Sequence, residues 1–497
     1  MNEQLFSAAE AALRKADLLR PSVTLLVALS GGADSVVLLR TLCGLAPTYG
    51  LTVRAAHVEH GLRGEASQRD ARFCEALCGE LSVPFSCDHA TLSGGMDDPG
   101  AEARARDARY ALLLARAKAC GADALVLAHH RDDQAETVLS RLTRGSGARG
   151  LTGMREQTIR EGVMILRPFL SVSKRELTDA LGSLPHCEDE TNALPCCQRN
   201  RLRAEVLPLL TMENPRAAEH IAQSARLLAL DEDCLMAQAE RLSTRALCMV
   251  PPFFYAEKAL LRTAPDAVAL RALRFFAEQG MAQALSGRTS QDGTTSPDSE
   301  AALPEEHSLS APDSLRLLAL LTAPDGETLN LPAGLKALVT PRHVHLVRMA
   351  DGSPLHAVPT PAPQAGLSSR ARVRFGGLTF RFTPCAPGES PAPDGLRSIV
   401  LPSATLTRAV LRTAQPGDRI RPFGAPGGKP LRRYWIDHKV DLPFRAFIPL
   451  LCVDDEVLWA TGAGASEATR RTEAPSVRIE ITGRMPWLPP DQRKSSK

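Results

Sequence analysis

The chain has 497 residues, of which 44% are hydrophobic and 23% charged, as in an ordinary globular protein of about two to four domains. Its net charge of +3 is too small to indicate an anionic partner over the whole surface, so any contact with nucleic acid has to be local. No apolar run approaches the roughly 20 residues that span a bilayer, and the first residues lack the charged-then-apolar order of a signal peptide. We therefore expect a cytoplasmic protein that does not enter a membrane.

The first part of the chain, residues 1–213, alternates short apolar runs with amphipathic stretches. The runs predict buried strands at Thr24–Leu29, Thr52–Val58 and Ala124–Ala128, and the stretches predict helices at Ser35–Leu42, Glu65–Leu81 and Glu102–Cys120. This order favours an α/β domain with a parallel sheet and helices on both faces. Ligands of such sheets bind at the carboxyl ends of the strands. Further on, Ser173 and Glu176 have the spacing of a capping box that opens another helix.

The rest of the chain divides by composition into three parts and a short tail (486–497). Residues 214–350 predict a helical domain, except that the polar stretch 286–312 has too few apolar groups to become ordered. Residues 351–369, rich in Pro and Ala, predict a linker. Residues 370–485 predict a small α+β domain, with strand-like alternation at Val373–Phe382, Val457–Ala460 and Val477–Ile481.

A glycine-containing loop lies between the first predicted strand and the helix that follows it. Its residues, all candidates for binding a nucleotide phosphate, are Ser30, Gly31, Gly32, Ala33, Asp34 and Ser35. The glycines let the backbone approach an anion closely, and a helix N-terminus favours negative charge. Asp34 would repel phosphate by itself, so we expect it to bind Mg²⁺ that bridges to the phosphates. The loop lacks the lysine of a Walker A motif, so γ-phosphate transfer is not indicated.

Charged side chains gather where the carboxyl ends of the other strands are expected. His57–Arg63 ends the second strand, and Arg109 shares a helix face with Glu102 and Arg106. That face alone could equally be a solvated row of ion pairs. Arg144 belongs to a basic run broken by glycines, which suits a loop lying on phosphates.

A second face of charged residues follows the third predicted strand. His129, Asp133 and Glu136 recur at helical spacing, so they share one face; they could be catalytic or could hold a metal ion. After the acidic run Glu188–Asn192, Arg199 and Arg203 could be ordinary helix-surface charge or could contact a substrate.

The twelve cysteines are scattered, and none forms a Cys-x-x-Cys pair. Zinc ribbons and thioredoxin-like sites are therefore not indicated. We expect reduced, mostly buried thiols, because a chain of this length does not depend on disulfides for stability.

The glycine loop resembles that of the ATP-pyrophosphatase family, whose members adenylate a carbonyl-type oxygen and release pyrophosphate. Over residues 20–215 the motifs SGGADS, HVEHGLR, EARARDARY, AHHRDDQAETVLSRLTRGSGARGL and RNRLRAEVLPLL resemble more specifically the bacterial tRNA(Ile)-lysidine synthetases. A block from Gly417 to Ser466 resembles the C-terminal domain of that family. The resemblance implies an adenine-nucleotide α-hydrolase-like fold for the N-terminal domain.

The same resemblance implies the reaction. ATP would adenylate the C2 oxygen of the wobble cytidine in the isoleucine tRNA with a CAU anticodon, and free L-lysine would then displace AMP, changing the codon read from AUG to AUA. Asp34, Arg109, His129, Asp133 and Glu136 would be catalytic, with Asp133 and Glu136 holding lysine, His129 a base and Arg109 facing the α-phosphate. Arg144, Arg199 and Arg203 would contact lysine or tRNA.

Partners and alternatives follow from the same comparison. The helical domain at 214–350 and a C-terminal basic cluster would contact the tRNA. The cluster comprises Arg419, Arg421, Lys429, Arg432, Arg433 and Lys439. Members of the family are often dimers, so the resemblance allows a homodimer, but the sequence does not give the oligomeric state. The alternatives are a tRNA 2-thiolation enzyme of the same loop family, which usually carries Cys-x-x-Cys pairs, an amidating ligase, which usually needs an ammonia-supplying domain, and a tRNA-binding module with an inactive loop.

Overall fold

The computed structural model describes most of the chain in eleven separate ranges. They are residues 3–59, 65–90, 101–187, 198–250, 253–289, 309–350, 355, 361–385, 394–469, 475–483 and 485–488. These residues form two compact units, which divide inside helix α10 (Ala217–Ala246) after Leu235. The finer division into four parts remains a prediction from the sequence.

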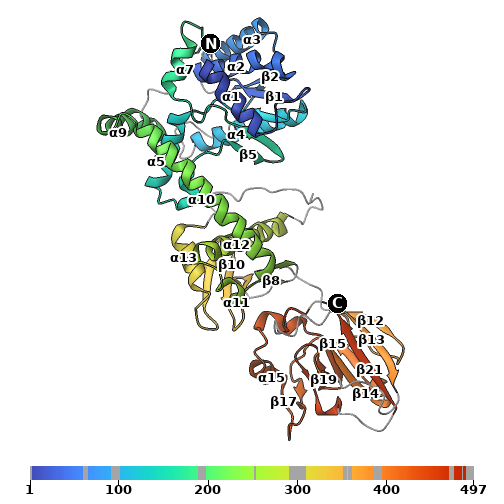
Figure 1. Cartoon of the computed structure of the whole chain (residues 1–497). Helices are drawn as coiled ribbons and strands as arrows, with labels where there is room; N and C mark the ends of the chain where they lie inside the picture. The colour runs from blue at the N-terminus through green and yellow to red at the C-terminus, as the bar shows by residue number, and fades with distance from the viewer. Residues whose placement is uncertain are drawn as a thin grey trace. The chain divides into compact units, whose positions relative to one another are not determined.

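The first unit is built on a six-stranded sheet with the order β3-β2-β1-β4-β6-β5 (Figure 1). All neighbouring strands are parallel except the edge pair β5–β6. The strands are β1 (Thr24–Ala28), β2 (Thr52–Glu59), β3 (Phe85–His89), β4 (Ala124–Val126), β5 (Gln157–Arg160) and β6 (Val163–Leu166). The predicted parallel sheet is confirmed, including all three strands expected from the apolar runs.

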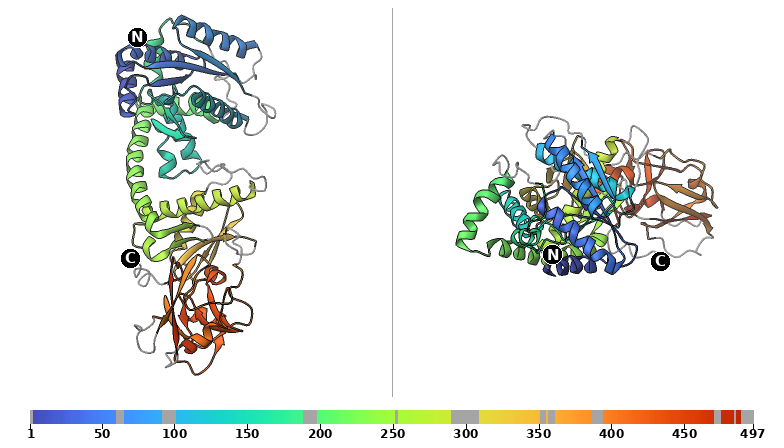
Figure 2. Two further views of the ribbon diagram at one scale, coloured as in Figure 1. Left: turned by 90° about the vertical axis from the view of Figure 1, so that its right-hand side faces the viewer. Right: turned by 90° about the horizontal axis from the view of Figure 1, so that it is seen from above.

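Helices cover both faces of this sheet (Figures 1 and 2). Alternate residues of β1 point to opposite sides: Leu25 and Val27 pack in one apolar cluster with α1, α2, α3 and α7, and Leu26 packs in another with α4. The helices are α1 (Glu3–Lys15), α2 (Ala33–Tyr49), α3 (Glu65–Glu80), α4 (Ala101–Ala119), α5 (Arg131–Thr143), α6 (Ala148–Leu151), α7 (Lys174–Leu181), α8 (Gln198–Arg201), the π-helical turn η2 (Leu202–Val206) and α9 (Leu207–Glu213). The three predicted helices and the Ser173–Glu176 capping box are confirmed.

The second unit opens with helices and a five-stranded antiparallel sheet of order β7-β8-β11-β10-β9. Its elements are β7 (Leu247–Val250), β8 (Phe253–Glu257), α11 (Lys258–Leu261), α12 (Asp266–Thr289), α13 (Ala311–Ala319), β9 (Thr328–Leu331), β10 (Leu335–Val339) and β11 (His343–Arg348). The expected helices are present, but the sequence pattern did not indicate this sheet.

Two further sheets complete the second unit around one apolar core that contains Trp459, Phe380 and Phe444. Their orders are β12-β13-β21-β14 and β15-β18-β19-β16-β17, with β20 paired to β19. The elements are β12 (Arg372–Phe375), β13 (Leu378–Cys385), β14 (Ser398–Pro402), α14 (Ser403–Leu406), β15 (Val410–Arg412), β16 (Arg419–Ile420), β17 (Lys429–Pro430), α15 (Leu431–Asp437), η5 (Leu442–Phe447), β18 (Leu450–Val453), β19 (Glu456–Ala460), β20 (Gly464–Ala465), η6 (Glu467–Thr469) and β21 (Ser476–Thr482).

The three runs predicted as strands in this region are strands, with one difference, and the other strands of the two sheets were not predicted. The run Val373–Phe382 is a hairpin of β12 and β13, because Gly376 and Gly377 both adopt positive φ and reverse the chain.

None of the ten described cysteines is in a disulfide, as expected, but only four of them are buried: Cys74, Cys78, Cys248 and Cys452. Among the described helices, none is long and apolar enough to cross a membrane. Residues 290–308 of the stretch expected to be disordered lie outside the described residues. Where that stretch is described, residues 286–289 end α12 and residues 311–312 begin α13, so disorder was the wrong expectation for its two ends.

Candidate active site

The glycine loop connects β1 to α2 at the carboxyl edge of the parallel sheet, as predicted. Gly32 is the N-cap of α2, and its carbonyl accepts the first helical hydrogen bonds, from Ser35 and Val36. The Ser30 and Ser35 hydroxyls lie 3.2 Å apart, and Ser35 also donates to the Gly32 carbonyl. The free N–H groups of the first turn therefore open onto the space beyond the sheet edge, where an anion is favoured.

Gly31 is the loop position at which any other residue would force neighbouring atoms to shift. Its φ of +87° lies in the left-handed region, and a Cβ there would sit 2.9 Å from the Cys187 sulfur and 3.3 Å from the Cys74 sulfur. Its carbonyl accepts a hydrogen bond from the Cys187 N–H at 2.9 Å. The two thiols thus pack beneath the loop and hold its backbone in place.

Asp34, on the first turn of α2, is joined to two residues from distant parts of the chain. Its Oδ1 accepts from Lys174 Nζ at 2.7 Å, and its Oδ2 lies 3.7 Å from His130 Nε2. Lys174 opens α7, and its own N–H donates to Asp132 at 2.8 Å. The loop itself contains no lysine, but Lys174 of α7 contacts it through Asp34. The sequence pattern identified neither Lys174 nor His130 as a site residue.

His130 links the glycine loop to α5. Its Nδ1 accepts from the Asp133 N–H, and its Nε2 lies between Oδ2 of Asp133 at 3.4 Å and Oδ2 of Asp34 at 3.7 Å. Asp133 Oδ2 in turn accepts from the His130 N–H, which completes a capping box. The second histidine of the AHHRDD motif is therefore the one that faces the loop.

Asp133 and Glu136 lie together on α5, as predicted, but the chain's own arginines already bind them. Arg199 donates to Glu136 and to Asp133, at 2.7 Å each. Arg203 donates to Glu136 Oε1 at 2.6 Å and lies 3.3 Å from Asp133. Burial would raise the pKa of Asp133, but His130 and Arg199 outweigh it and lower the pKa, so this carboxylate stays ionised.

This cluster of two carboxylates and two guanidiniums overturns one alternative interpretation. A metal ion bound by His129, Asp133 and Glu136 is not supported, because their ligand atoms do not come together and the carboxylates are taken by Arg199 and Arg203. The side chain of Glu136 is only 1% exposed, so these ion pairs lie inside the protein rather than on its surface.

His129 and Arg109 lie in the same positively charged neighbourhood. Burial, assisted by Arg167, Arg199 and Arg109, lowers the pKa of His129 to about 3, against the opposing effect of Asp133. The ring is therefore neutral at physiological pH, and its buried Nδ1 has no hydrogen-bond partner. Burial also lowers the pKa of Arg109, which makes no hydrogen bond or ion pair with any residue in the described ranges. An uncompensated, half-buried guanidinium is a ready site for an anion.

The glycine-rich segment after α5 is held more tightly than a loop lying freely on phosphate would be. Gln134 binds it from the helix, donating to the Met154 carbonyl at 3.0 Å and accepting from the Met154 N–H at 2.7 Å. Arg141 donates to the carbonyls of Gly150 and Gly153. Arg144 is exposed at the C-cap of α5, where its guanidinium bonds only to Ser140 among the described residues.

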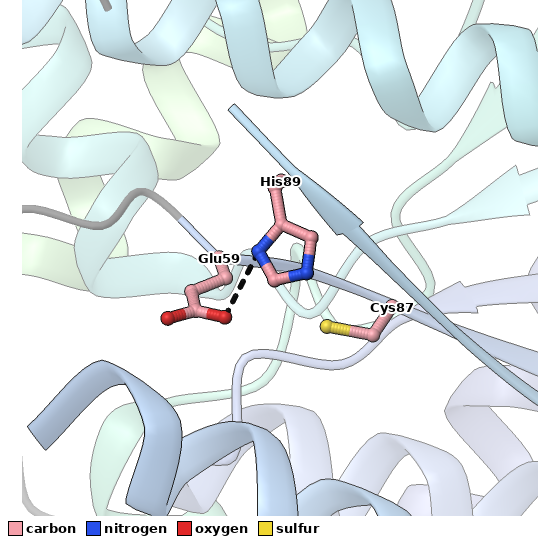
Figure 3. Close-up of side chains that lie close together, drawn as sticks. All are labelled: Glu59, Cys87 and His89. Atoms are coloured by element: carbon pink, nitrogen blue, oxygen red, sulfur yellow. Dashed lines mark ion pairs between the residues drawn. The ribbon is translucent and has the colours of Figure 1, made fainter. Parts of the chain in front are cut away.

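Glu59, Cys87 and His89 form a second group at the carboxyl edge (Figure 3). They come from adjacent parallel strands, in which Glu59 lies opposite His89 and Cys87 is two residues before it. Glu59 pairs with His89 at 3.0 Å, and the Cys87 sulfur points towards them (Figure 3). Burial raises the pKa of Cys87, so its thiol stays protonated, and His89 is 75% exposed. This arrangement is a weak site for a metal ion.

Several predicted features fall outside the described residues. They are His60–Arg63 of the second motif, the acidic run Glu188–Asn192 and the segment Ala193–Cys197 that follows it. The side chain of Glu102 is likewise not described.

The fold and the loop define a PP-loop protein, and the PP-loop domain family matches residues 3–210. The family of the TilS substrate C-terminal domain matches residues 409–481. Curated relatives extend over nearly the whole chain: the tRNA(Ile)-lysidine synthase of Symbiobacterium thermophilum is 32% identical over 94% of this chain and 95% of its own length. That of Geobacter sulfurreducens is 33% identical over 92% of each chain. The chain belongs to the tRNA(Ile)-lysidine synthase family.

Solved structures resemble this chain less closely. The U34-tRNA thiolase NcsA of Methanococcus maripaludis, with its [4Fe-4S] cluster, aligns with a TM-score of 0.39 and 18% identity, over 46% of this chain and 79% of that one. A likeness at this level is too weak to indicate a shared activity.

Proposed function

We propose that this protein joins free lysine to C2 of the wobble cytidine in the isoleucine tRNA with a CAU anticodon, using ATP and giving lysidine, AMP and pyrophosphate. The observation that carries the proposal is the full-length similarity to tRNA(Ile)-lysidine synthases, which spans both the PP-loop domain and the C-terminal domain. The chemistry needs two steps, because the C2 oxygen is a poor leaving group until AMP is attached to it.

The glycine loop is the proposed grip on the pyrophosphate end of ATP. The N–H groups of the first turn of α2, the two serine hydroxyls and Lys174 all converge there. The carboxylates of Asp34 and Asp132, both within 3.7 Å of His130, are the kind of oxygen donors that Mg²⁺ prefers beside nucleotide phosphates. When bound, Mg²⁺ would neutralise phosphate charge and so make pyrophosphate a better leaving group.

Arg109 is the proposed partner of the α-phosphate. Its guanidinium is half-buried without a counter-ion among the described residues, so an incoming phosphate would supply the missing charge. Negative charge builds up on the α-phosphate as the cytidine oxygen attacks it, and a fixed cation stabilises that state more than it stabilises free ATP.

Asp133 and Glu136 are the proposed lysine-binding carboxylates. Because Arg199 and Arg203 occupy them, an ammonium group has to displace or join a guanidinium. An ammonium group that replaces one guanidinium keeps the charge of the two buried carboxylates balanced. Arg199 and Arg203 would then be free to contact the tRNA, as the exposed Arg144 already is.

His129 remains the proposed base for the ε-ammonium, although its environment makes it a weak one. The nearby guanidiniums contribute to its low pKa. Phosphate binding would offset their charge and raise that pKa, so proton transfer would be favoured only once ATP is in place. Such an order would protect the enzyme from activating lysine without a nucleotide.

The second unit is the proposed tRNA-binding part. Its basic cluster lies on and around β16, β17 and α15, and part of it is neutralised within the protein, since Lys429 and Arg433 both pair with Asp437. We further propose that the enzyme acts in the cytoplasm, where its substrates are, and that it is a homodimer; light scattering on the purified protein would test the latter.

One assay tests the whole proposal. The protein is incubated with labelled lysine, ATP, Mg²⁺ and transcripts of either isoleucine tRNA with a CAU anticodon or methionine tRNA. Lysine should enter only the former, with one AMP released for each lysine joined. Sulfur transfer without lysine incorporation would favour the 2-thiolation alternative and refute the proposal.

A further inference from the structure

The second unit contains a cluster of titratable side chains that the proposed reaction does not use. His343 and His345 lie two residues apart on β11, so they point to the same face of the sheet. Asp441, directly before η5, meets both of them. All three are almost completely buried, with side-chain exposures of 1%, 3% and 2%.

The two oxygens of Asp441 differ in their contacts. Both rings approach the same carboxylate oxygen: His343 Nδ1 lies 2.5 Å and His345 Nε2 3.1 Å from Asp441 Oδ2. The other oxygen, Oδ1, is buried and has no hydrogen-bond partner in the described part of the chain, and the same is true of His343 Nε2. Buried polar atoms without a protein partner are rare in folded proteins, and where they occur a bound water or ion often satisfies them.

Asp441 is the acid that both rings contact. Burial would raise the pKa of Asp441, but its hydrogen bonds from His343 and His345 outweigh it and hold the pKa well below the usual range. The guanidinium of Arg445 donates to the Val440 carbonyl. The cluster therefore holds a buried carboxylate between two imidazole rings, three side chains of the types that bind zinc.

The pairing of strands places one more acidic group beside the cluster. Glu257 on β8 lies directly across from His343, and Tyr255 lies across from His345, so both point to the same face. Glu257 is itself buried. One face of two neighbouring strands therefore carries two histidines and a carboxylate, and the two histidines contact Asp441.

We propose that His343, His345 and Asp441 form a structural zinc site that ties β11 to the segment leading into η5. Zinc bonds of about 2.0–2.1 Å in a tetrahedron keep ligand atoms about 3.3 Å apart. The three ligand atoms here lie within 4.8 Å of one another, so small side-chain shifts suffice. The fourth position goes to a water, because the group whose ligand atoms come together consists of these three side chains. Their side chains are only 1–3% exposed, which fits an ion that stabilises the fold rather than one that is open to a substrate.

The test is metal analysis of the full-length protein purified without an affinity tag that binds metals. We expect about one zinc ion per chain by mass spectrometry and a lower melting temperature after treatment with EDTA, restored by zinc. Cobalt(II) added to the stripped protein should give the strong visible absorption of a tetrahedral complex, a signature of the wild-type chain that does not depend on any variant folding.

Variants then test whether the metal ion binds at this cluster. Asp441→Asn, which keeps the shape of the side chain, should lose the zinc and the cobalt absorption, and its melting temperature should no longer respond to EDTA. His438→Ala is the matched control, since this histidine of the same unit bonds to a backbone carbonyl and stacks on Tyr434; it should keep the metal. If the wild-type chain binds neither metal, the cluster is only a hydrogen-bonded triad and the proposal fails. It fails equally if Cys87→Ser removes the zinc and Asp441→Asn does not.

Discussion

Two charged clusters beside helix α5 differ in how exposed they are. In the first, near its N-terminus, Asp34 of α2 and Lys174 of α7 form a pair with side chains 27% and 47% exposed, next to the buried His130; we call it the open cluster. In the second, one turn on, Glu136 is 1% exposed and Arg199 and Arg203 pair with it; we call it the closed cluster. If the proposed roles are right, a phosphate can enter the open cluster directly, whereas lysine has to replace an arginine in the closed one. The difference teaches that two substrates of one reaction can meet different obstacles beside the same helix.

The largest effect should come from the open cluster. Asp34→Ala should reduce pyrophosphate release by about 10²–10³-fold or more, because it removes the carboxylate that organises cations beside the phosphates. Binding of tRNA, measured by filter retention, should change little. Asp34→Asn, of the same shape, should be nearly as inactive; weakened tRNA binding with normal pyrophosphate release would place Asp34 in tRNA recognition instead.

Changing the closed cluster should separate the two steps. In Glu136→Gln, lysine incorporation should fall by about 10²-fold while tRNA-dependent pyrophosphate release continues, because only the second step needs lysine. The unfolding free energy should also fall, by up to about 3 kcal/mol, since Arg199 and Arg203 lose a buried counter-charge. Glu161→Gln, at an exposed pair with Lys118, is the control and should affect neither. Equal loss of both steps would show that the clusters do not act separately.

Substitution of Lys174 should have a smaller effect on the reaction, and this effect should be confined to the binding of ATP. Lys174→Met should raise the KM for ATP by about 10-fold, because a cation beside the phosphates is lost, without changing the KM for lysine. Lys174→Arg should keep most of the activity, and Arg175→Met, whose side chain is 91% exposed, should match the wild type. A change in the KM for lysine alone would assign Lys174 to the closed cluster.

The smallest effect on activity is expected where the segment after α5 packs against Gln134 of that helix. Gly153 has a φ of +66°, and a Cβ there would lie 2.6 Å from the Gln134 amide. Gly153→Ala should therefore lower the unfolding free energy by about 1–3 kcal/mol and should weaken both steps alike. Gly162→Ala, at φ +77° with nothing within 4 Å, isolates the backbone strain and should cost less in a denaturant titration. Equal costs would mean that the contact with Gln134 does not matter.

A feature could be predicted from the sequence when the residues that form it are close together in the chain. The glycine loop was predictable because strand, turn and helix follow one another within a few residues. Lys174 was not, because the residue that it contacts, Asp34, is 140 positions away. Arg199 and Arg203 were recognised as site residues, yet their pairing with Asp133 and Glu136 spans 63 to 70 positions, and helical spacing carries no information on it.

The same limit explains the unpredicted sheet of the second unit. Its strands β8 and β11 pair Tyr255 with His345, so their partners lie far apart in the chain and each strand is only a few residues long. By contrast, the hairpin of β12 and β13 is local, and the error there was only to overlook the two glycines that divide it.

The arginines of α8 and η2 have a consequence for how the enzyme is made. Until Arg199 and Arg203 leave the ribosome, Glu136 lacks both cations that it pairs with and Asp133 lacks two of its three, although the whole parallel sheet has already been synthesised. A nascent chain or a fragment that stops before residue 198 would leave Glu136, which is 1% exposed in the complete chain, without a counter-charge. It could form the sheet and the glycine loop, but α5 would be less stable. Formation of the ion pairs on α5 is thereby coupled to arrival of the segment that leads into the rest of the protein.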